Sequence, residues 1–544
     1  MFLGIYEGYS LYFFSSRNDY LHIKENNAQI IFIGELLASE EEAYFSFKQF
    51  LQNQYAKHIL FLRGNYQTII RISDHLWLFP DLSNVRPIYY TKLNQQFLFA
   101  SHLITLQKEI HPSLNIPWFT RSLYTNGFHI ETETPYKEIR MIPGGFGLHV
   151  SKNGTQLFQA WNVDAEETLT LDEAKEKLKE ELTASVLLRC REKNITTDLS
   201  GGLDSSTITW IASKKYPVKS ITIIGQEENE DRRIAKEIAK EQENIEHYPF
   251  TQDEIPSIYS NMDKIYTDTP ISFLWSANKV KKKFCWAREN QSEIHLSGEG
   301  GDTVLGADFT YLVDLIHQRK WKTFMSHAKG WADQKKESPW LWISGSLRLA
   351  FHLPFHPSQR HPLSTANDRA DWFTFSPVVK KGRYSKYLGV SNTLHGINYL
   401  GYISHGLKNL GDQEGVHLGV PYLDHNVVRV CIRTPSEWKM NPYKLKPLLK
   451  RAFQDELPTC LLSRNSKGDY TPDVYYGMRQ NFSWFQENFQ EMLLSKMGLV
   501  DIQKFHEYFH RLSVGTPVRL PEFHQTLSLE LWLRQSSKNR PLGG

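Results

Sequence analysis

The stretch TTDLSGGLDSS, residues 196–206, constrains the fold most strongly, because two adjacent glycines join an apolar and β-branched run to the start of a helix. Gly201 and Gly202 can adopt backbone angles that other residues avoid, and their lack of side chains lets an anion approach the main chain. The helix that follows would direct free N–H groups and its positive end at that anion. The turn therefore predicts a phosphate-binding loop. An ordinary tight turn between a strand and a polar helix cap is the alternative.

The polar residues of this turn indicate how it would hold its ligand. Ser200, Ser205 and Ser206 supply hydroxyl donors beside the free backbone amides. The turn lacks the GxxxxGK(S/T) spacing of a Walker A loop and contains no lysine. Asp204 is acidic where an anion would bind, which is explained if its carboxylate holds a Mg²⁺ ion that bridges the phosphates.

A second glycine-rich turn, LSGEGGDTVLGAD at residues 296–308, follows another apolar run and contains Glu299, Asp302 and Asp308. Parallel strands place such turns together at their carboxyl ends, where ligands bind. We therefore expect Asp302 to be a second Mg²⁺ ligand that faces Asp204. Glu299 is a candidate base, or a residue that orients a nucleophile. A flexible acidic surface loop is the alternative.

The chain divides into two halves with different patterns. Residues 1–165 contain short strands, turns such as Asn153-Gly154 and one helix over residues 40–56, which predicts an α+β domain with antiparallel sheets. Residues 169–544 begin with a long helix capped by Thr170 or Asp172. Strands then alternate with helices, which predicts an α/β domain with a doubly wound parallel sheet. The boundary is expected within residues 162–168.

Composition excludes several classes of protein. The net charge of +3 does not indicate a nucleic-acid-binding protein, and the basic run at residues 281–283 is interpreted as a solvated helix face. Four widely spaced cysteines predict neither a zinc site nor a disulfide framework, and they favour a reducing, cytoplasmic location. No signal peptide is recognised at the N-terminus. The apolar residues 340–355 include Arg348 and His352, so a buried helix is expected there and not a membrane span.

The two turns together resemble the asparagine synthetase B-type superfamily, whose members carry an SGGxDS pyrophosphate loop and a second GEGxDE-like loop. The resemblance covers nearly the whole chain. FPDLSNVRPIYY and FLFAS resemble segments of the family's glutamine amidotransferase domain, which has an Ntn-type fold. GVHLGVPYLDH at residues 415–425 and SRNSKGDYTP at residues 463–472 resemble two segments of its synthetase domain, the second of which carries a catalytic lysine.

The resemblance implies ATP and Mg²⁺ as cofactors and a reaction in which ATP adenylates a carboxylate before an amine attacks. Asp204 and Asp302 would bind Mg²⁺. Asp231 matches an acidic position of the pocket, although a helix N-terminus also favours a carboxylate there. Lys467, with Arg464 three residues earlier, matches the catalytic lysine, which would stabilise developing negative charge. The pocket for the adenine and ribose would be lined, mostly by backbone atoms, at Leu199, Ile224, Ser297 and Gly298.

The sequence departs from the family at the position that would hydrolyse glutamine. That chemistry needs a cysteine nucleophile at position 2, where this chain has Phe2, and Cys190 is its first cysteine. The first domain is therefore expected to supply no ammonia from glutamine. Members without this cysteine tend to form intramolecular amides. The β-lactam synthetases carry a tyrosine where Glu299 stands here, so the glutamate favours the lasso peptide cyclase branch.

That branch implies a linear precursor peptide as substrate, with a leader peptidase and a leader-binding protein as pathway partners. Three alternatives stay open: a β-lactam synthetase-like ligase, an ammonia-dependent asparagine synthetase, and a nucleotide-binding regulator without enzyme activity. The helical region of residues 321–382, which is rich in aromatic residues, is a candidate for part of the wall of the peptide-binding site. Simple core packing is the alternative.

Overall fold

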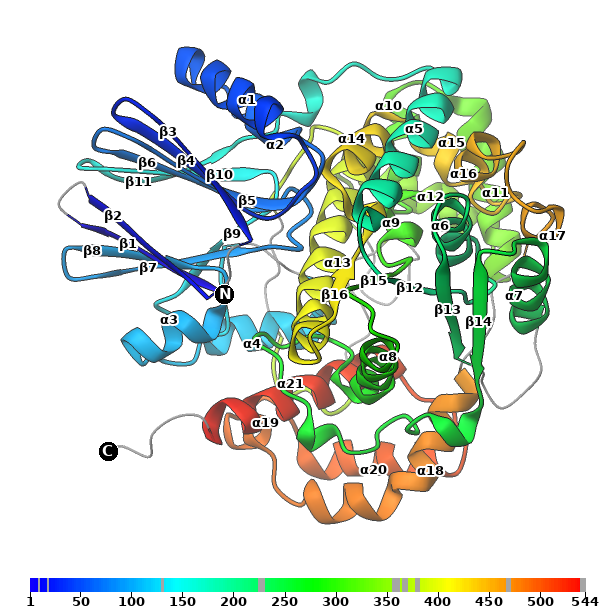
Figure 1. Cartoon of the computed structure of the whole chain (residues 1–544). Coiled ribbons are helices and arrows are strands. Elements are labelled where there is room, and N and C mark those ends of the chain that lie inside the picture. The colour runs from blue at the N-terminus through cyan, green and yellow to red at the C-terminus, as the bar shows by residue number, and fades with distance from the viewer. Residues whose placement is uncertain are drawn as a thin grey trace.

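The computed structural model describes residues 1–7, 10–16, 19–128, 132–223, 230–354, 363, 370–376, 382–465 and 471–538. Within these residues the strands form three sheets, two of them antiparallel in the N-terminal half and one parallel in the C-terminal half. Figure 1 shows the two antiparallel sheets stacked on one side of the molecule and the parallel sheet on the other. The predicted antiparallel and parallel sheets are therefore confirmed.

The N-terminal sheets face each other across a shared apolar layer. One sheet has the order β2-β1-β8-β7-β9, and the other has the order β11-β10-β6-β5-β4-β3. Alternate residues of both sheets, such as Ile33, Ile69 and Phe99, point into the layer between them. The strands are β1 Phe2–Glu7, β2 Ser10–Ser15, β3 Tyr20–Glu25, β4 Ala28–Leu36, β5 Gly64–Ile72, β6 His75–Phe79, β7 Ile88–Leu93, β8 Gln96–Ala100, β9 Arg140–Ile142, β10 Phe146–Ser151 and β11 Gly154–Gln159.

Local sequence signals explain where several of these elements begin and end. Helix α1, Glu40–Asn53, starts at a capping box in which Ser39 and Glu42 bind each other's backbone N–H groups. The hairpin of β10 and β11 pairs Ser151 with Gly154. Its two-residue turn is therefore Lys152–Asn153, so the predicted Asn153-Gly154 turn was wrong by one position. Gly154, with φ of 113°, is the first residue of the returning strand.

The C-terminal sheet contains five parallel strands in the order β14-β13-β12-β15-β16. From β12 the chain proceeds outward to β13 and β14, and it then returns to place β15 on the other side of β12. The strand order therefore reverses between β12 and β15, the position where ligands bind in open α/β sheets. The strands are β12 Ile195–Asp198, β13 Val218–Ile223, β14 Ile245–Phe250, β15 Ile294–Leu296 and β16 His417–Gly419.

Helices cover both faces of this sheet. On one face, Phe284 of α8 packs edge-on against His295 of β15. Helix α5 lies on the opposite face, because a Cβ added at Gly419 of β16 would contact Arg189 of α5 as well as Leu296 and Ile294 of β15. The capping box at Thr170 and Glu173 starts α5, so the predicted Thr170 cap is confirmed. The helices around the sheet are α5 Leu171–Cys190, α6 Leu203–Ser213, α7 Glu230–Glu241, α8 Ala277–Glu289, α9 Gly301–Val304 and α13 Leu388–Gln413.

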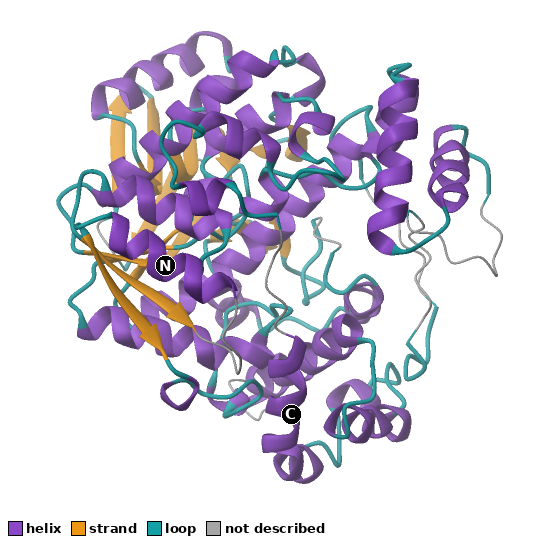
Figure 2. Ribbon diagram, turned by 90° about the vertical axis from the view of Figure 1, so that its right-hand side faces the viewer, coloured by secondary structure: helices purple, strands orange, loops and turns teal. Residues whose placement is uncertain are grey.

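The other helices complete the two halves, and Figure 2 shows that helices make up most of the C-terminal half. Helices α10, α11 and α12 surround a separate apolar core that contains Tyr311 and Trp342. No helix among the described residues is long and apolar enough to cross a membrane. The remaining bounds are α2 Lys57–Leu60, α3 Leu103–Ile110, α4 Ile116–Tyr124, α10 Tyr311–His317, α11 Trp321–Lys335, α12 Pro339–Ala350, α14 His425–Arg433, α15 Ser436–Lys439, α16 Pro447–Ala452, α17 Thr459–Leu462, α18 Thr471–Asn488, α19 Leu493–Lys496, α20 Ile502–Ser513 and α21 Leu520–Lys538.

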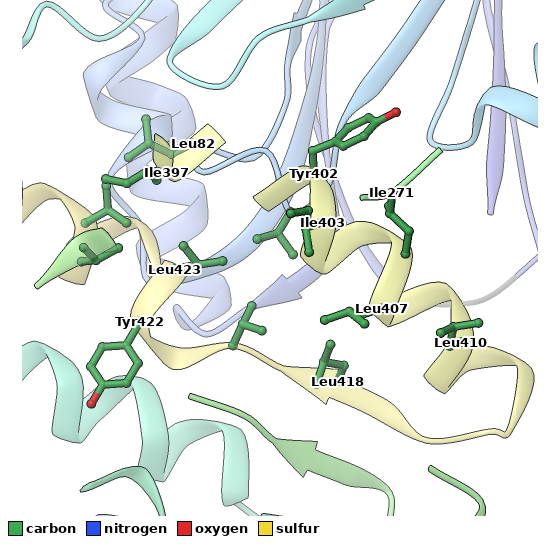
Figure 3. Packing of buried hydrophobic residues seen from close by; sticks show 14 of the residues in the cluster. Leu82, Ile271, Ile397, Tyr402, Ile403, Leu407, Leu410, Leu418, Tyr422 and Leu423 are labelled. Atoms are coloured by element: carbon green, nitrogen blue, oxygen red, sulfur yellow. The ribbon is translucent and has the colours of Figure 1, made fainter. Parts of the chain in front are cut away.

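The two halves share one continuous core, with α13 running between them (Figure 1). Figure 3 shows Leu82 of the N-terminal half in the same cluster as Ile397 and Leu423. A Cβ added at Gly401 of α13 would overlap the Ser83 carbonyl oxygen, so glycine permits this close approach. The two halves are therefore in direct backbone contact here.

A buried ionic network also crosses this interface. Arg189 of α5 is fully buried and binds Glu35 Oε2 at 2.7 Å and Asp424 Oδ2 at 3.0 Å. The same guanidinium donates to Asn65 Oδ1 at 2.7 Å. Because a buried cation is tolerated only when its donors are satisfied, this network fixes how the halves sit on each other.

Candidate active site

A cavity of about 560 Å³ lies at the point where the strand order of the parallel sheet reverses. Both predicted loops contribute to it, together with residues from α8, from α13, from the segment before α16 and from the segment after α17. Its lining residues are Asp198, Ser200, Gly202, Leu203, Asp204, Ser205, Ile221, Ile223, Ile258, Lys279, Ser297, Gly298, Glu299, Gly300, Asp302, Thr303, Leu400, Leu445, Lys446, Arg464 and Asp473.

The first loop presents the amino end of α6 to this cavity. Gly202 is the N-cap residue, and its N–H donates to Ser200 Oγ at 3.1 Å. Ser205 Oγ accepts from the Ser200 N–H at 3.1 Å and lies 2.8 Å from Ser200 Oγ. These bonds hold the loop open around a helix terminus that favours an anion.

Two residues expected in this part of the site lie elsewhere. Leu199 is fully buried; its N–H donates to Ile221 O at 2.8 Å, and its carbonyl accepts from Thr222. Ser206 is also fully buried behind the loop. Neither lines the cavity, because the Leu199 N–H and carbonyl are bound to the neighbouring strand β13 and α6 turns the Ser206 side chain into the protein core. Ile224 lies outside the described residues.

Gly201 explains how the first loop is locked in place. Its φ of 76° is in the left-handed region, and an added Cβ would overlap the Asp231 carbonyl oxygen. The Gly201 carbonyl accepts from Arg464, which also pairs with the Asp231 carboxylate. Arg464 and Asp231 are 3% and 5% exposed, so the pair is almost completely buried. Asp231 therefore holds the cavity residue Arg464 and does not line the cavity itself.

The second loop packs directly on the first. A Cβ added at Gly298 would lie 2.7 Å from Ser205 N, and one added at Gly301 would lie 2.5 Å from Asp204 Cγ. Glycine at these two positions therefore lets the loops touch. The contact brings Asp302 and Glu299 to the same cavity as Asp204. The prediction that the two loops meet at one edge of the sheet is confirmed.

One ammonium group binds both predicted metal ligands. Lys446 Nζ lies 2.7 Å from Asp302 Oδ1 and is also paired with Asp204 Oδ2. The two carboxylates can thus address a single cation, which is the arrangement that a bridging Mg²⁺ requires. Mg²⁺ is commonly bound by one or two carboxylates together with substrate phosphates, so this donor set fits the ion. Asp204 and Asp302 would hold it, and the ion would neutralise charge on the phosphates.

Sequence comparison identifies the family to which this site belongs. Residues 177–534 match the family model for asparagine synthase. The chain belongs to the asparagine synthase family. This family consists of ATP-dependent amide-forming ligases. The matched residues include every residue that lines the cavity.

Individual members of the asparagine synthase family are distant in sequence. Glutamine-hydrolysing asparagine synthetase 2 of Bacillus subtilis strain 168 is 25% identical over 475 residues, covering 81% of this chain and 60% of that protein. Asparagine synthetase 3 of the same organism is 23% identical, covering 71% of this chain and 63% of that protein. A putative asparagine synthetase of Methanocaldococcus jannaschii is 27% identical, covering 68% and 55%. The chain thus spans about 60% of the length of these relatives.

Several residues of this asparagine synthase site were not predicted from the sequence. Lys279 of α8 lines the cavity and lies 3.3 Å from Asp473 of α18, and Lys446 lines it next to Asp302. An isolated lysine in a helical segment carries no local signal for such a role. Helix α16 begins at Pro447, and Lys446 before it is left-handed, with φ of 45°.

The basic run at residues 281–283 was wrongly interpreted as fully solvated. Lys283 is 12% exposed, and its ammonium lies 3.0 Å from the Asp198 carboxylate, which lines the cavity. Asp198 was not predicted either, although it is a charged residue in a buried strand, and such a residue usually has a specific partner. Lys467, the predicted catalytic lysine, lies outside the described residues, while Arg464 and Asp473 on either side of it both line the cavity.

A much smaller cavity lies where β1 begins, between the N-terminal sheets and α13. Phe2 is 2% exposed, and its ring packs against Phe13 and Phe99 at centroid distances of 5.4 and 6.2 Å. The cavity beside it has a volume of about 40 Å³. The first side chain of β1 is thus a buried aromatic ring.

Proposed function

We propose that this chain is an ATP-dependent macrocyclase. It activates an Asp or Glu side-chain carboxylate of a linear precursor peptide and joins it to the N-terminal amine of the same peptide, which gives an isopeptide bond. The observation that carries the proposal is the contact between the two loops, which brings Asp204 and Asp302 to one shared cation. The role of the chain as an amide-forming enzyme rests on this geometry and on its family.

The reaction has two steps. In the first, a carboxylate oxygen of the peptide attacks the α-phosphorus of ATP, the bond between the α- and β-phosphates breaks, and pyrophosphate leaves. In the second, the neutral N-terminal amine attacks the acyl carbon, the bond to AMP breaks, and the amine loses its proton. The sum is one amide, one AMP and one pyrophosphate for each ATP consumed.

The residues of the cavity suit these steps. The amino end of α6 and the bent first loop offer backbone N–H groups to the departing pyrophosphate. Lys446 and Arg464 line the cavity and supply positive charge. Glu299 lines the cavity beside Gly298 and is our candidate for accepting the proton of the amine. Lys467 stays our prediction for the cation that stabilises the adenylate and the tetrahedral oxyanion.

The first half of the chain supports an intramolecular reaction. Residues 1–165 contain no cysteine, and the buried Phe2 ring leaves a cavity of about 40 Å³ at the start of β1. We infer that glutamine is not hydrolysed there, so the nucleophile is an amine that the substrate itself carries. Holding both ends of one peptide in the cavity is worth up to about 7–11 kcal/mol relative to a bimolecular reaction.

The glutamate form of the second loop favours a peptide substrate over a β-lactam precursor. The β-lactam synthetases, which are another branch of the superfamily that the chain resembles, carry a tyrosine at the position of Glu299. Two other functions remain alternatives: an ammonia-dependent asparagine synthetase and a nucleotide-binding regulator. The intact set of Asp204, Glu299, Asp302 and Arg464 around one cavity speaks against a regulator without chemistry.

The peptide wall and the protein partners remain proposals. Residues of α10, α11 and α12 form their own apolar core, and none of them lines the nucleotide cavity. Trp340 and Phe351 are nevertheless 68% and 60% exposed on this helical region, which is our candidate surface for the peptide. A leader peptidase and a leader-binding protein would supply the peptide in the form that this enzyme needs.

The proposal is tested with synthetic linear peptides that carry a free N-terminal amine and one internal Asp or Glu. With the protein, ATP and Mg²⁺, a substrate should lose the mass of one water molecule and produce AMP. Matched peptides with Asn or Gln at the acidic position, or with an acetylated amine, should not react. Turnover of free aspartate and ammonium in place of any peptide would contradict the proposal and identify an asparagine synthetase.

A further inference from the structure

We propose that Asp198 is a positioning residue that fixes Ser297, and with it the second loop, in the geometry that binds the nucleotide. The inference rests on the proposed function only in taking ATP as the ligand of the cavity. It does not depend on which carboxylate is activated. Asp198 is the last residue of β12 and lines the cavity.

Three side chains from two neighbouring elements bind the Asp198 carboxylate. Lys283 Nζ of α8 donates to both carboxylate oxygens at 3.0 Å. His295 Nε2 lies 3.2 Å from Oδ1, and Ser297 Oγ donates to Oδ2 at 2.9 Å. His295 and Ser297 lie on and just after β15, the strand that leads into the second loop.

The environment keeps this carboxylate charged. Burial alone would raise the pKa of Asp198, but Lys283 and His295 outweigh it and hold the pKa well below its usual range. His295 is fully buried, and burial lowers the pKa of its ring although Asp198 opposes this. Because the ionised carboxylate only accepts hydrogen bonds, Nε2 of His295 carries the proton between them.

The carboxylate has no acceptor capacity left for a ligand. Its two oxygens offer about four lone-pair sites. Lys283 uses one on each oxygen, and His295 and Ser297 use the other two. Asp198 therefore acts on the nucleotide through Ser297 and not by direct contact.

Ser297 is held on both of its sides. Its N–H donates to the carbonyl of Gly419 at the end of β16 at 3.0 Å, and its hydroxyl donates to Asp198 at the end of β12. The next residue, Gly298, is so close to the first loop that an added Cβ would lie 2.7 Å from Ser205 N. The position of Ser297 thus sets the separation of the two loops that enclose the cavity.

The test uses binding of α,β-methylene-ATP with Mg²⁺, measured by calorimetry, because this analogue cannot be cleaved at the bond that the reaction breaks. The variants are the charge-matched double variant D198N/K283M and S297A. The double variant removes both partners of the ion pair, so no buried lysine is left without its counterion. K281M is the matched control on the same helix, since Lys281 is 37% exposed and pairs with Glu414 at 3.7 Å.

We expect D198N/K283M to unfold thermally close to the parent protein and yet to bind the analogue at least about tenfold more weakly. S297A should weaken binding in the same direction, and K281M should bind as the parent does. Parent-like binding of the analogue by D198N/K283M would overturn the inference, because the network would then contribute only to packing. Parent-like binding by S297A beside a weakened D198N/K283M would also overturn it, because Asp198 would then act directly. Failure of the parent to bind would overturn the proposed function as well, so the two failures are distinguishable.

Discussion

Lys446 Nζ lies 2.7 Å from Asp302 Oδ1, so a lysine from the segment before α16 reaches a carboxylate of the second loop. The same ammonium is bound to Asp204 of the first loop. Two carboxylates from two loops thus share one positive charge. A Mg²⁺ ion would compete with Lys446 for the same oxygens and free its ammonium to face the phosphates.

The first prediction concerns this shared charge. K446M should lower the free energy of unfolding by about 1–2 kcal/mol in the absence of Mg²⁺, because the two carboxylates lose the ammonium group of Lys446. Added Mg²⁺ should restore the thermal midpoint, since it replaces the lost positive charge. Thermal unfolding with and without MgCl₂ measures both effects.

The matched control for Lys446 is K444M, which changes an exposed lysine two residues earlier. It should leave the midpoint unchanged under both conditions. A K446M protein whose midpoint did not respond to Mg²⁺ would argue against a cation site between Asp204 and Asp302.

The second prediction concerns the planar guanidinium group of Arg464. Its guanidinium binds the Gly201 carbonyl and the Asp231 carboxylate at once, and a lysine has no planar fork with which to do both. R464K should therefore lower kcat/KM for ATP by roughly 10- to 100-fold, or about 1.4–2.7 kcal/mol. R451K, at an exposed arginine of α16, is the control and should retain parental kinetics. Equal kinetics for R464K and R451K would show that the first loop does not need this anchor.

The third prediction concerns the contact between the loops. G301A adds a Cβ at 2.5 Å from Asp204 Cγ, so the carboxylate must move. We expect nucleotide turnover to fall by about tenfold or more, with little change in thermal stability. G415A is the control: its φ of 76° makes alanine strained there, but no atom lies within 4 Å of the added Cβ. Turnover that dropped in G415A and persisted in G301A would contradict the importance of the contact.

The fourth prediction is a pH dependence of stability. Burial raises the pKa of Asp314 to about 7, although the backbone N–H groups of Gly389 and Val390 oppose the shift. Asp314 therefore binds more protons in the folded than in the unfolded state between about pH 4 and 7, so its contribution to the free energy of unfolding falls as the pH rises through this range. Asp308 is the nearby charge that adds to the effect.

D314N should remove this loss, because the amide carries no charge, and its single oxygen can still accept from one of the two N–H groups, which bind different oxygens of the carboxylate. The thermal midpoint of D314N should exceed that of the parent at pH 8, and the two should converge at pH 5. A gap that widened toward pH 5 would show that Asp314 is ionised in the folded protein at low pH.

The fold and the two loops could be predicted because their signals are local. Glycine pairs, helix caps and alternating strands are readable in short windows, and the rule for parallel sheets then brings residues 199–206 and 296–302 together. Thr170 could be identified as a cap because Glu173 completes its capping box.

The partners of the loops could not be predicted, because they come from far along the chain. Lys446 is 242 residues from Asp204, and Arg464 is 263 residues from Gly201. Nothing near a single lysine or arginine specifies which buried carboxylate it will meet. The resemblance placed Leu199 in the site through its backbone, and Ser206 was expected there as a hydroxyl donor of the same turn. In the structure the Leu199 backbone binds β13 and the Ser206 side chain is buried, so neither reaches the cavity.

The central claim is that a carboxylate attacks the α-phosphorus of ATP held between these two loops. The most direct measurement is ³¹P NMR of the nucleotide products while a reactive peptide is converted. We predict one AMP and one pyrophosphate for each peptide that loses a water molecule, and neither product with D204N or D302N. Formation of ADP and phosphate would contradict attack at the α-phosphorus. Turnover by D204N or D302N at the rate of the parent protein would contradict the role of the two loops.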